Sequence, residues 1–324
     1  MKHKILEALE GASGKFVSGE RLSDGLGISR TAVWKHISAL RREGYAIVGQ
    51  PRSGYALIAA PDKLLPAAVK AGLDTKVIGT KVRYLTSAAS TNDCAKEMAR
   101  QGAPEGTVVV AEEQTGGRGR MGRPWASPPG GGLWFSVILR PALTPPQAPR
   151  LTLVAAVAVA RAIRHTTGLE AGIKWPNDII VGGRKVCGIL TEMVAEIDRV
   201  EFVVLGIGLN VNLGRKGLPQ DLRDCATSLD IELGRRLDRA AVFRSILREF
   251  ESWYMRYLQD GPVPALSEWR QLSITLGERV RVVGQGESFE GTATGIDEDG
   301  ALIVKPDGGP ERRVLSGDVS LRSA

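Results

Sequence analysis

The stretch GTVVVAEEQTGGRGRMGRPW, from Gly106 to Trp125, joins a run of valines to ten residues that contain four glycines and three arginines. The valines predict a strand that leads directly into the glycine- and arginine-rich loop. Gly119, between two arginines, allows backbone conformations that side chains forbid and lets a ligand approach the main chain closely. Because arginine forks match the oxygens of phosphate or carboxylate, the loop is predicted to bind an anion.

The segments on either side of this loop predict alternating strands and helices. Residues 81–102 read as a strand, a polar turn and a helix that begins with Ser90 or Thr91 as its N-cap. Residues 131–140, GGLWFSVILR, predict another strand. A disordered basic segment is the alternative for the loop, and the strands that flank it argue against disorder.

Three later stretches carry residues that suit the same chemistry. They are IKWPNDIIV (173–181), GGRKVCGIL (182–190) and VVLGIGLNVN (203–212). Each has an ordinary interpretation: a β-turn, a hairpin, and an apolar strand that breaks at Gly206 and Gly208. Together they supply lysines, a carboxylate, amides and glycines, which an anionic reaction centre with a nucleotide would use. The sequence has no P-loop or dinucleotide-binding fingerprint.

The first sixty residues predict a DNA-binding module. Two short helices around Gly25–Gly27 are followed by the hairpin pattern GYAIVGQPRSGYAL, with Arg52 at its tip, which is the order of a winged helix. Val33, Ile37 and Leu40 are spaced to face the core. The opposite face carries cations and hydroxyls that suit phosphates and base edges. The residues expected to contact DNA are Ser29, Arg30, Thr31, Trp34, Lys35, Ser38 and Arg52. Winged helices also dock proteins, so this alternative stays open.

Length and charge agree with more than one domain. A chain of 324 residues exceeds one typical core, and its net charge is +7. Residues 1–60 hold nine Lys/Arg against five Asp/Glu, which favours a polyanionic partner for that end. The N-terminus shows no export signal, and the apolar run 151–160 is too short to cross a bilayer, so a cytoplasmic protein without membrane contact is expected. Three widely spaced cysteines predict free thiols rather than a metal site.

The C-terminal end predicts a small β unit. The aromatic segment 243–261 reads as a helix, and short β-patterned segments follow from about residue 274. Turn signals lie at 284–286, 297–300 and 307–309.

The motifs GRGRMGRPW, KWPND, KVCGIL and GIGLN, in this order behind SGERLSDGLGISRTAVWKHI, resemble the bifunctional biotin protein ligases and biotin-operon repressors, the BirA family. The likeness covers nearly the whole chain; Met121 departs from it, since another cation often stands there. It implies an α+β protein with a winged helix-turn-helix (1–64), a mixed α/β biotin- and ATP-binding domain like class II aminoacyl-tRNA synthetases (65–273), and an SH3-like β-barrel (274–324).

In that family biotin and ATP give biotinyl-5′-adenylate, and the biotinyl group then passes to a lysine of a biotin carboxyl carrier protein. Mg²⁺ shares the pyrophosphate charge. The adenylate is also the corepressor that promotes a homodimer on operator DNA of the biotin genes. The resemblance therefore implies ATP, Mg²⁺ and biotin as ligands, and a carrier protein and an operator as partners.

The resemblance also implies site residues. The catalytic set is Arg118, Arg120, Lys185 and Asp178. Biotin contacts are Ser90, Thr91, Asn92, Gln114, Arg118, Gly119, Arg120 and Lys185. ATP or adenylate contacts are Arg118, Arg120, Arg123, Trp125, Lys174, Asn177 and Asn210. Asp178 is the candidate Mg²⁺ ligand, or the base that deprotonates the accepting lysine. Trp125 and Trp134 are equally consistent with packing over the ligand and with plain core packing.

Three other functions fit parts of the pattern. A lipoate- or octanoate-transferring enzyme shares the catalytic fold, although the arginine loop argues against it. A ligase whose winged helix binds no DNA, or a sensor that has lost transfer, would also carry these motifs; labelling of a carrier protein separates them.

Overall fold

The computed structural model describes residues 1–283, 288–315 and 317–321, which form two compact units, 1–74 and 75–324. The predicted turn at 284–286 lies outside the described residues. In the part of the chain that is described, every helix is too short or too polar to span a membrane. Cys94, Cys187 and Cys225 are free thiols.

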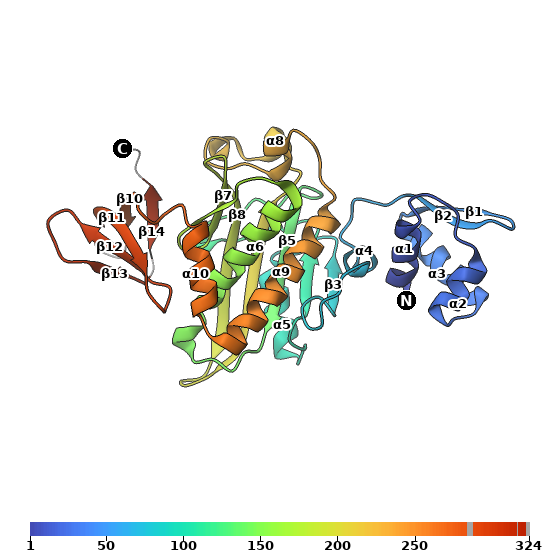
Figure 1. Ribbon diagram of the computed structural model, residues 1–324, viewed down its shortest axis with the longest axis horizontal. Helices are drawn as coiled ribbons and strands as arrows, with labels where there is room; N and C mark the ends of the chain where they lie inside the picture. The colour runs from blue at the N-terminus through green and yellow to red at the C-terminus, as the bar shows by residue number, and fades with distance from the viewer. Residues whose placement is uncertain (284–287, 316, 322–324) are drawn as a thin grey trace. The chain divides into compact units, whose positions relative to one another are not determined.

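The first unit is a helical bundle with a two-stranded hairpin (Figure 1). Its elements are α1 (Lys2–Gly11), α2 (Gly19–Leu26), α3 (Arg30–Arg42), β1 (Ala46–Gln50), β2 (Gly54–Ala59) and α4 (Pro66–Lys70). The predicted cap of α3 is confirmed, because Ser29 Oγ accepts a hydrogen bond from Ala32 N at 3.1 Å. Val33, Ile37 and Leu40 are buried as their spacing requires. Arg52 lies at the tip of the hairpin with φ +65°.

This unit continues past residue 64, where the sequence suggested its end. Pro66 starts α4, because proline suits the first turn of a helix. Ala67 and Ala71 are buried in the same apolar cluster as Ile5 and Leu9 of α1. The compact unit therefore extends to Asp74.

The second unit is built on a mixed seven-stranded sheet with the order β3-β4-β5-β9-β8-β7-β6. The strands are β3 (Val82–Leu85), β4 (Val108–Ala111), β5 (Gly132–Leu139), β6 (Gly172–Lys174), β7 (Asp178–Val181), β8 (Arg184–Ala195) and β9 (Val200–Asn210). Among the described strands of this sheet only β3 and β4 pair in parallel, and α5 (Thr91–Arg100) joins them. The apolar run 151–160 forms the buried centre of α6 (Arg150–Thr167), as predicted.

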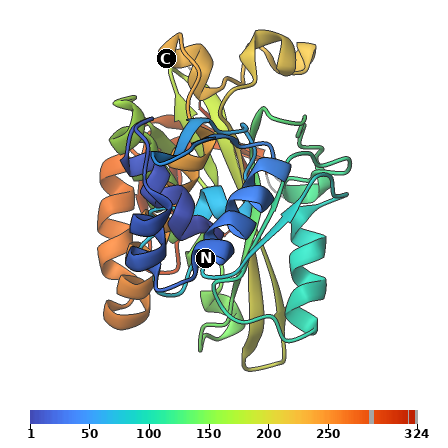
Figure 2. The ribbon, with the colours of Figure 1, turned by 90° about the vertical axis from the view of Figure 1, so that its right-hand side faces the viewer.

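Helices cover both faces of this sheet. In Figure 2, α5 lies on one side and α9 (Arg239–Asp260) and α10 (Val263–Leu272) on the other. Ala95 and Ala99 of α5 pack on Val109, Ile138 and Val204 of the sheet. The short elements are α7 (Gly214–Gly217), α8 (Leu229–Leu233) and the 3-10 turns η1 (Arg120–Gly122), η2 (Pro145–Gln147) and η3 (Gln220–Leu222).

A five-stranded antiparallel sheet of order β13-β12-β11-β10-β14 completes the unit, as the β pattern predicted. Its strands are β10 (Arg279–Val283), β11 (Ser288–Ile296), β12 (Leu302–Pro306), β13 (Arg312–Val314) and β14 (Asp318–Leu321). It is anchored to the larger sheet, since Trp175 donates its indole N–H to Gly300 O at 3.0 Å and its backbone N–H to Thr275 Oγ1 at 2.9 Å.

One prediction about the large sheet is wrong. β9 does not break at Gly206 and Gly208 but runs through both glycines, pairing with β8 as far as Leu209 and with β5 as far as Asn210. The glycines serve another purpose: a Cβ atom on Gly206 would lie 2.2 Å from Asn92 Oδ1, and one on Gly208 would lie 2.5 Å from Trp125 Nε1. They leave room above the strand for these side chains.

Candidate functional site

The arginine-rich loop is a folded hairpin above the sheet. Gln114 pairs with Ser127, Trp125 N donates to Gly117 O at 2.9 Å, and Gly119 N donates to Arg123 O at 2.7 Å. The tip carries Met121, a non-glycine residue with φ +56°. The chain is therefore ordered by its own backbone pairing before any ligand is considered.

Within this loop, steric crowding requires glycine at Gly117 and not at Gly119. Gly119 has φ −100° and ψ −167°, an extended conformation open to any residue. A Cβ atom on Gly117, by contrast, would lie 2.5 Å from Trp125 O and 2.9 Å from Ser127 Oγ. Gly117 is thus the position where the hairpin strands approach too closely for a side chain.

A cavity of about 280 Å³ lies between this hairpin, the first turn of α5 and the sheet. Its floor is formed by glycines of neighbouring strands, with Gly188 of β8 opposite Gly208 of β9. Leu213, Leu218, Leu222 and Ala226 form an apolar wall. A small, mostly apolar pocket with a few polar groups is typical of a site for a small organic molecule.

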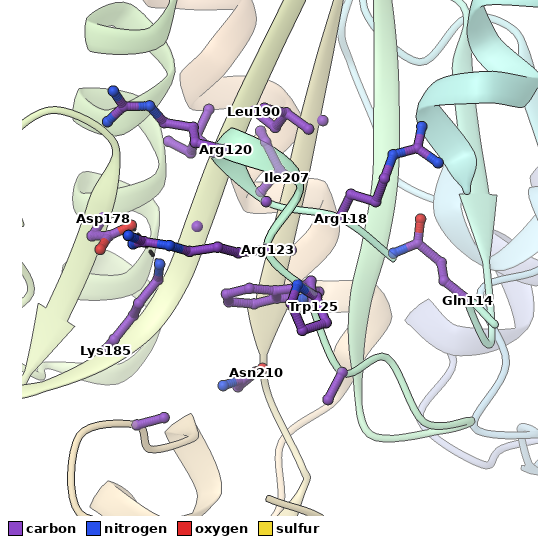
Figure 3. A pocket seen from close by; sticks show the side chains of 18 of the residues that line it. Gln114, Arg118, Arg120, Arg123, Trp125, Asp178, Lys185, Leu190, Ile207 and Asn210 are labelled. Carbon is purple, nitrogen blue, oxygen red and sulfur yellow. Dashed lines mark ion pairs between the residues drawn. The ribbon is translucent and has the colours of Figure 1, made fainter. Parts of the chain in front are cut away.

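The cations divide between two sides of the cavity (Figure 3). Lys185 Nζ lies 2.6 Å from Asp178 Oδ1 and 5.3 Å from the centre of the Trp125 ring. Arg120 donates to Asn177 Oδ1 at 3.3 Å, and Arg123 also borders the cavity. These groups form one cluster beside the ends of β7 and β8, where a bound anion would meet several positive charges.

Arg118 points away from Lys185, toward the opposite side of the cavity (Figure 3). Its Nη2 donates to both carboxylate oxygens of Asp93, at 2.7 and 2.8 Å. The structure therefore separates Arg118 from Arg120 and Lys185, which the sequence grouped as one catalytic set. Asp93 was not predicted as a partner, because nothing in the sequence brings the start of one helix against a loop 25 residues later.

The hydrogen bond from Arg118 holds the pKa of the Asp93 carboxyl below its ordinary value of 3.8, although burial opposes the shift. A carboxyl with a lowered pKa in the folded state adds stability above its unfolded pKa, and this stability is lost as the pH falls through the folded value. We therefore expect Asp93→Asn to lower the melting temperature near neutral pH and to have no effect well below pH 3.8. Melting curves at several pH values test this, and a difference that persists in acid would contradict it.

Two residues predicted to bind the ligand are bonded to each other, and a third is held by other side chains. Gln114 Oε1 accepts from Thr91 N at 2.8 Å and from Thr91 Oγ1 at 3.1 Å, and so caps α5 in place of Ser90. Asn92 donates to Glu192 at 2.7 Å and accepts from Ser136 Oγ at 2.6 Å. Ser90, which makes no capping bond, borders the cavity, as do Thr91, Asn92 and Gln114.

The fixed position of Asn92 makes Gly206 sensitive to substitution. Because Asn92 is held at both ends of its amide, it cannot yield to the new methyl group of Gly206→Ala, and we expect a loss of about 1–3 kcal/mol of stability. Urea unfolding measures the loss. Gly295→Ala in β11 is the control, since a Cβ atom there meets nothing within 4 Å; equal effects of the two substitutions would refute the argument.

The remaining predicted residues are also placed by the structure. Asn210 borders the cavity, and its amide donates to Thr227 O at 2.9 Å. Lys174 lies in an adjoining cavity of about 330 Å³ that Arg120 and Arg123 also border, beside Val283 and Val319 of the small sheet. Trp134 is fully buried and bonds Pro128 O, so core packing accounts for it. Trp125 lies over the glycine floor, and its indole nitrogen is buried without an acceptor in the described part of the chain.

Asp178 is the carboxylate available for a metal. Within residues 1–283, 288–315 and 317–321, no three His, Cys, Asp or Glu side chains are grouped to hold a metal ion. Mg²⁺ commonly uses one or two carboxylates together with substrate phosphates. A single carboxylate beside a cluster of cations at the cavity edge fits that mode rather than an all-protein metal cage.

The predicted DNA-contacting residues lie on one exposed element and the hairpin. Thr31, Trp34 and Lys35 of α3 are exposed, and Arg52 is exposed at the hairpin tip. Ser38 is half-buried, and Arg30 pairs with Glu20 at 3.0 Å. Ser29 uses its hydroxyl to cap α3. Arg41 Nε donates to Ile47 O at 2.8 Å and so joins the end of α3 to the hairpin.

Comparison with known proteins agrees with this organisation. Residues 84–210 match the Biotin/lipoate A/B protein ligase family, residues 275–322 the Biotin protein ligase C terminal domain, and residues 2–56 an HTH domain. The chain is 44% identical to the bifunctional ligase/repressor BirA of Bacillus subtilis over 321 residues, covering 99% of this chain and 98% of that protein. It is 34% identical to the Escherichia coli protein of the same description, covering 97% and 95%. The biotin protein ligase of Aquifex aeolicus, solved with biotin and ATP, superposes with a TM-score of 0.65 at 29% identity, covering 76% of this chain and all of that one.

Proposed function

The chain belongs to the family of bifunctional ligase/repressor proteins, and on this premise we propose that it joins biotin to a carrier protein and represses transcription. The observation that carries the proposal is one cavity of about 280 Å³, in which Lys185, Arg120 and Arg123 gather beside an apolar wall. Such a pocket suits a molecule with an apolar body and an anionic end that must meet a nucleotide phosphate.

The first proposed step joins biotin to ATP. A carboxylate oxygen of biotin attacks the α-phosphorus, the bond to the pyrophosphate oxygen breaks, and biotinyl-5′-adenylate and pyrophosphate form. Two anions must approach each other, so Arg120 and Lys185 would stabilise the charge that grows on the phosphoryl oxygens. Arg118 would join them by leaving Asp93. Mg²⁺, held chiefly by the substrate phosphates with Asp178 nearby, would neutralise the leaving pyrophosphate.

The polar residues around the cavity divide the recognition of the two substrates. Ser90 and Thr91 at the start of α5, with Gln114 bonded to Thr91, would bond the ureido ring of biotin, with Asn92 and Gly119 beside them. Arg123, Trp125, Lys174, Asn177 and Asn210 would contact the nucleotide. The small sheet is proposed to be an SH3-like barrel, and the seven-stranded sheet to be related to class II aminoacyl-tRNA synthetases.

In the second step the ε-amine of a carrier lysine attacks the acyl carbon, and AMP leaves. The amine must lose a proton, and Asp178 is the carboxylate nearest to the cation cluster. The test of the ligase is transfer of biotin to a biotin carboxyl carrier protein in the presence of Mg-ATP, with lipoate as the competing acid. Labelling by biotin alone supports the proposal, and labelling by lipoate in preference to biotin overturns it.

The repressor function rests on the first unit. Biotinyl-5′-adenylate is proposed to favour a homodimer that binds an operator more tightly, since a ligand that prefers the dimer-competent form must shift the population toward it. Binding of the protein to its own biotin-gene promoter should tighten only when biotin and Mg-ATP are both present. If DNA binding ignores both ligands while a carrier is still labelled, the protein is a ligase whose winged helix serves another purpose.

We expect Lys35→Ala to weaken operator binding and to reduce the slope of log affinity against log salt by about one, as the loss of one phosphate contact does. Lys305→Ala, on the exposed surface of the small sheet, changes the net charge equally and is the control. Filter-binding titrations at several salt concentrations measure both. An unchanged slope for Lys35→Ala would remove this lysine from the DNA contact.

A further inference from the structure

The arginine-rich hairpin has two ends, its feet, and one buried side chain bonds to both of them. The loop leaves the sheet after β4 at Glu112 and re-enters it at Gly132, the first residue of β5. These feet are adjacent because β4 and β5 pair antiparallel, with Ala111 opposite Trp134. Arg239 Nη2 donates to Glu112 Oε2 at 2.8 Å, and its Nη1 donates to Gly132 O at 3.0 Å.

Arg239 is completely buried although it carries a charge. An uncompensated charge in that position would be strongly unfavourable, so the guanidinium is confined to the geometry that satisfies both acceptors. The planar fork fixes the direction of both bonds at once, which a single ammonium group cannot do. Arg239 is therefore a rigid link between the two feet, in addition to the strand pairing that makes them adjacent.

The segment that carries Arg239 is itself anchored to the same end of the sheet. Asp238 caps α9 by accepting from Ala240 N and Ala241 N. Asn212, just past the end of β9, exchanges two hydrogen bonds with the backbone of Leu237. Its own backbone N–H donates to Gly131 O at 2.7 Å, which adds a further bond to the β5 foot.

We propose that Arg239 is a positioning residue that fixes the two feet of the hairpin, so that Arg118, Arg120, Arg123 and Trp125 close over the adenylate. This inference rests on the proposed ligase function. Arg239 does not border the cavity and acts only through the loop. If the two feet are loosened, the cations of the hairpin remain present but are poorly placed. The adenylate should then dissociate faster, while its formation from biotin and ATP continues.

The test compares Arg239→Lys with Arg140→Lys. Arg140 follows the far end of β5 and clamps Ala99 O and Ala103 O, so its loss also removes guanidinium contacts to the backbone, but away from the loop. Adenylate is formed with labelled biotin and Mg-ATP, and its release is followed during a chase with unlabelled biotin. We expect about tenfold faster release from Arg239→Lys, the effect of losing one hydrogen bond of a charged group, and wild-type release from Arg140→Lys. Equal release from both variants overturns the proposal.

A second measurement needs no ligand turnover. Trypsin should cleave the hairpin arginines of Arg239→Lys faster than those of wild type and Arg140→Lys when no ligand is present. If Arg239→Lys does not fold, Asn212→Ala replaces it, since it removes the two side-chain bonds to Leu237 that anchor the segment carrying Arg239 and leaves the buried ion pair intact. Cleavage at the wild-type rate refutes the positioning role of Arg239. If the wild-type protein forms no adenylate, the proposed ligase function is refuted, but the cleavage test of Arg239 remains valid.

Discussion

Lys185→Met is expected to lower the rate of adenylate formation by about 10²–10³-fold, the usual effect of removing one preorganised charge at a transition state. The ammonium lies 2.6 Å from Asp178 and over the Trp125 ring, at the edge of the cavity. Methionine keeps an unbranched chain of similar length, so the loss measures the charge rather than the packing.

Release of pyrophosphate under biotin and ATP saturation measures this first step directly. Lys81→Met is the control, because Lys81 is exposed and does not border the cavity. A loss smaller than about tenfold would mean that Arg120 and Mg²⁺ carry the developing charge without Lys185, a limit set by the size of a single good electrostatic contact. The binding of Lys185 to Asp178 would then be structural.

Asp178→Asn is expected to slow transfer from adenylate to the carrier lysine by about 10²–10⁴-fold, the contribution of a positioned general base. Asparagine has nearly the same shape and cannot accept a proton from the attacking amine. The substitution also removes the counterion of Lys185, so adenylate formation should fall as well, but it should remain detectable.

Single-turnover transfer from preformed adenylate separates the two steps for this variant. A loss confined largely to transfer supports a base, whereas an equal loss in pyrophosphate release and transfer indicates a metal ligand or a structural role. Asn177→Asp is a useful companion, since Asn177 precedes Asp178 and accepts from Arg120 at the cavity edge. Combined with Asp178→Asn, it adds a carboxylate at 177 without restoring the one at 178. Recovery of transfer by the double variant would show that a nearby base suffices and that position 178 itself is not required.

Local features of the fold could be predicted because their causes lie within a few residues. Ser29 caps α3 through a bond to Ala32, three positions away, and Val33, Ile37 and Leu40 share one helical face. The valines of β4 and the apolar centre of α6 likewise carry their own pattern. The prediction that β9 breaks at its glycines was wrong. It applied the local rule that glycine weakens a strand, and this rule ignores the side chains that pack above the strand.

The sequence by itself determined the chemistry: the loop arginines, the lysine and carboxylate of the later motifs, and the order of helices and strands that carries them. The tertiary structure alone decided which of these groups meet. Arg118 pairs with Asp93 rather than with Lys185, Gln114 caps a helix that begins 23 residues earlier, and Arg239 reaches Glu112 across 127 positions. Hydrogen bonds and ion pairs act over about 3 Å in space, and separation along the chain does not enter their energy, so only the packed sheet and helices select the partners.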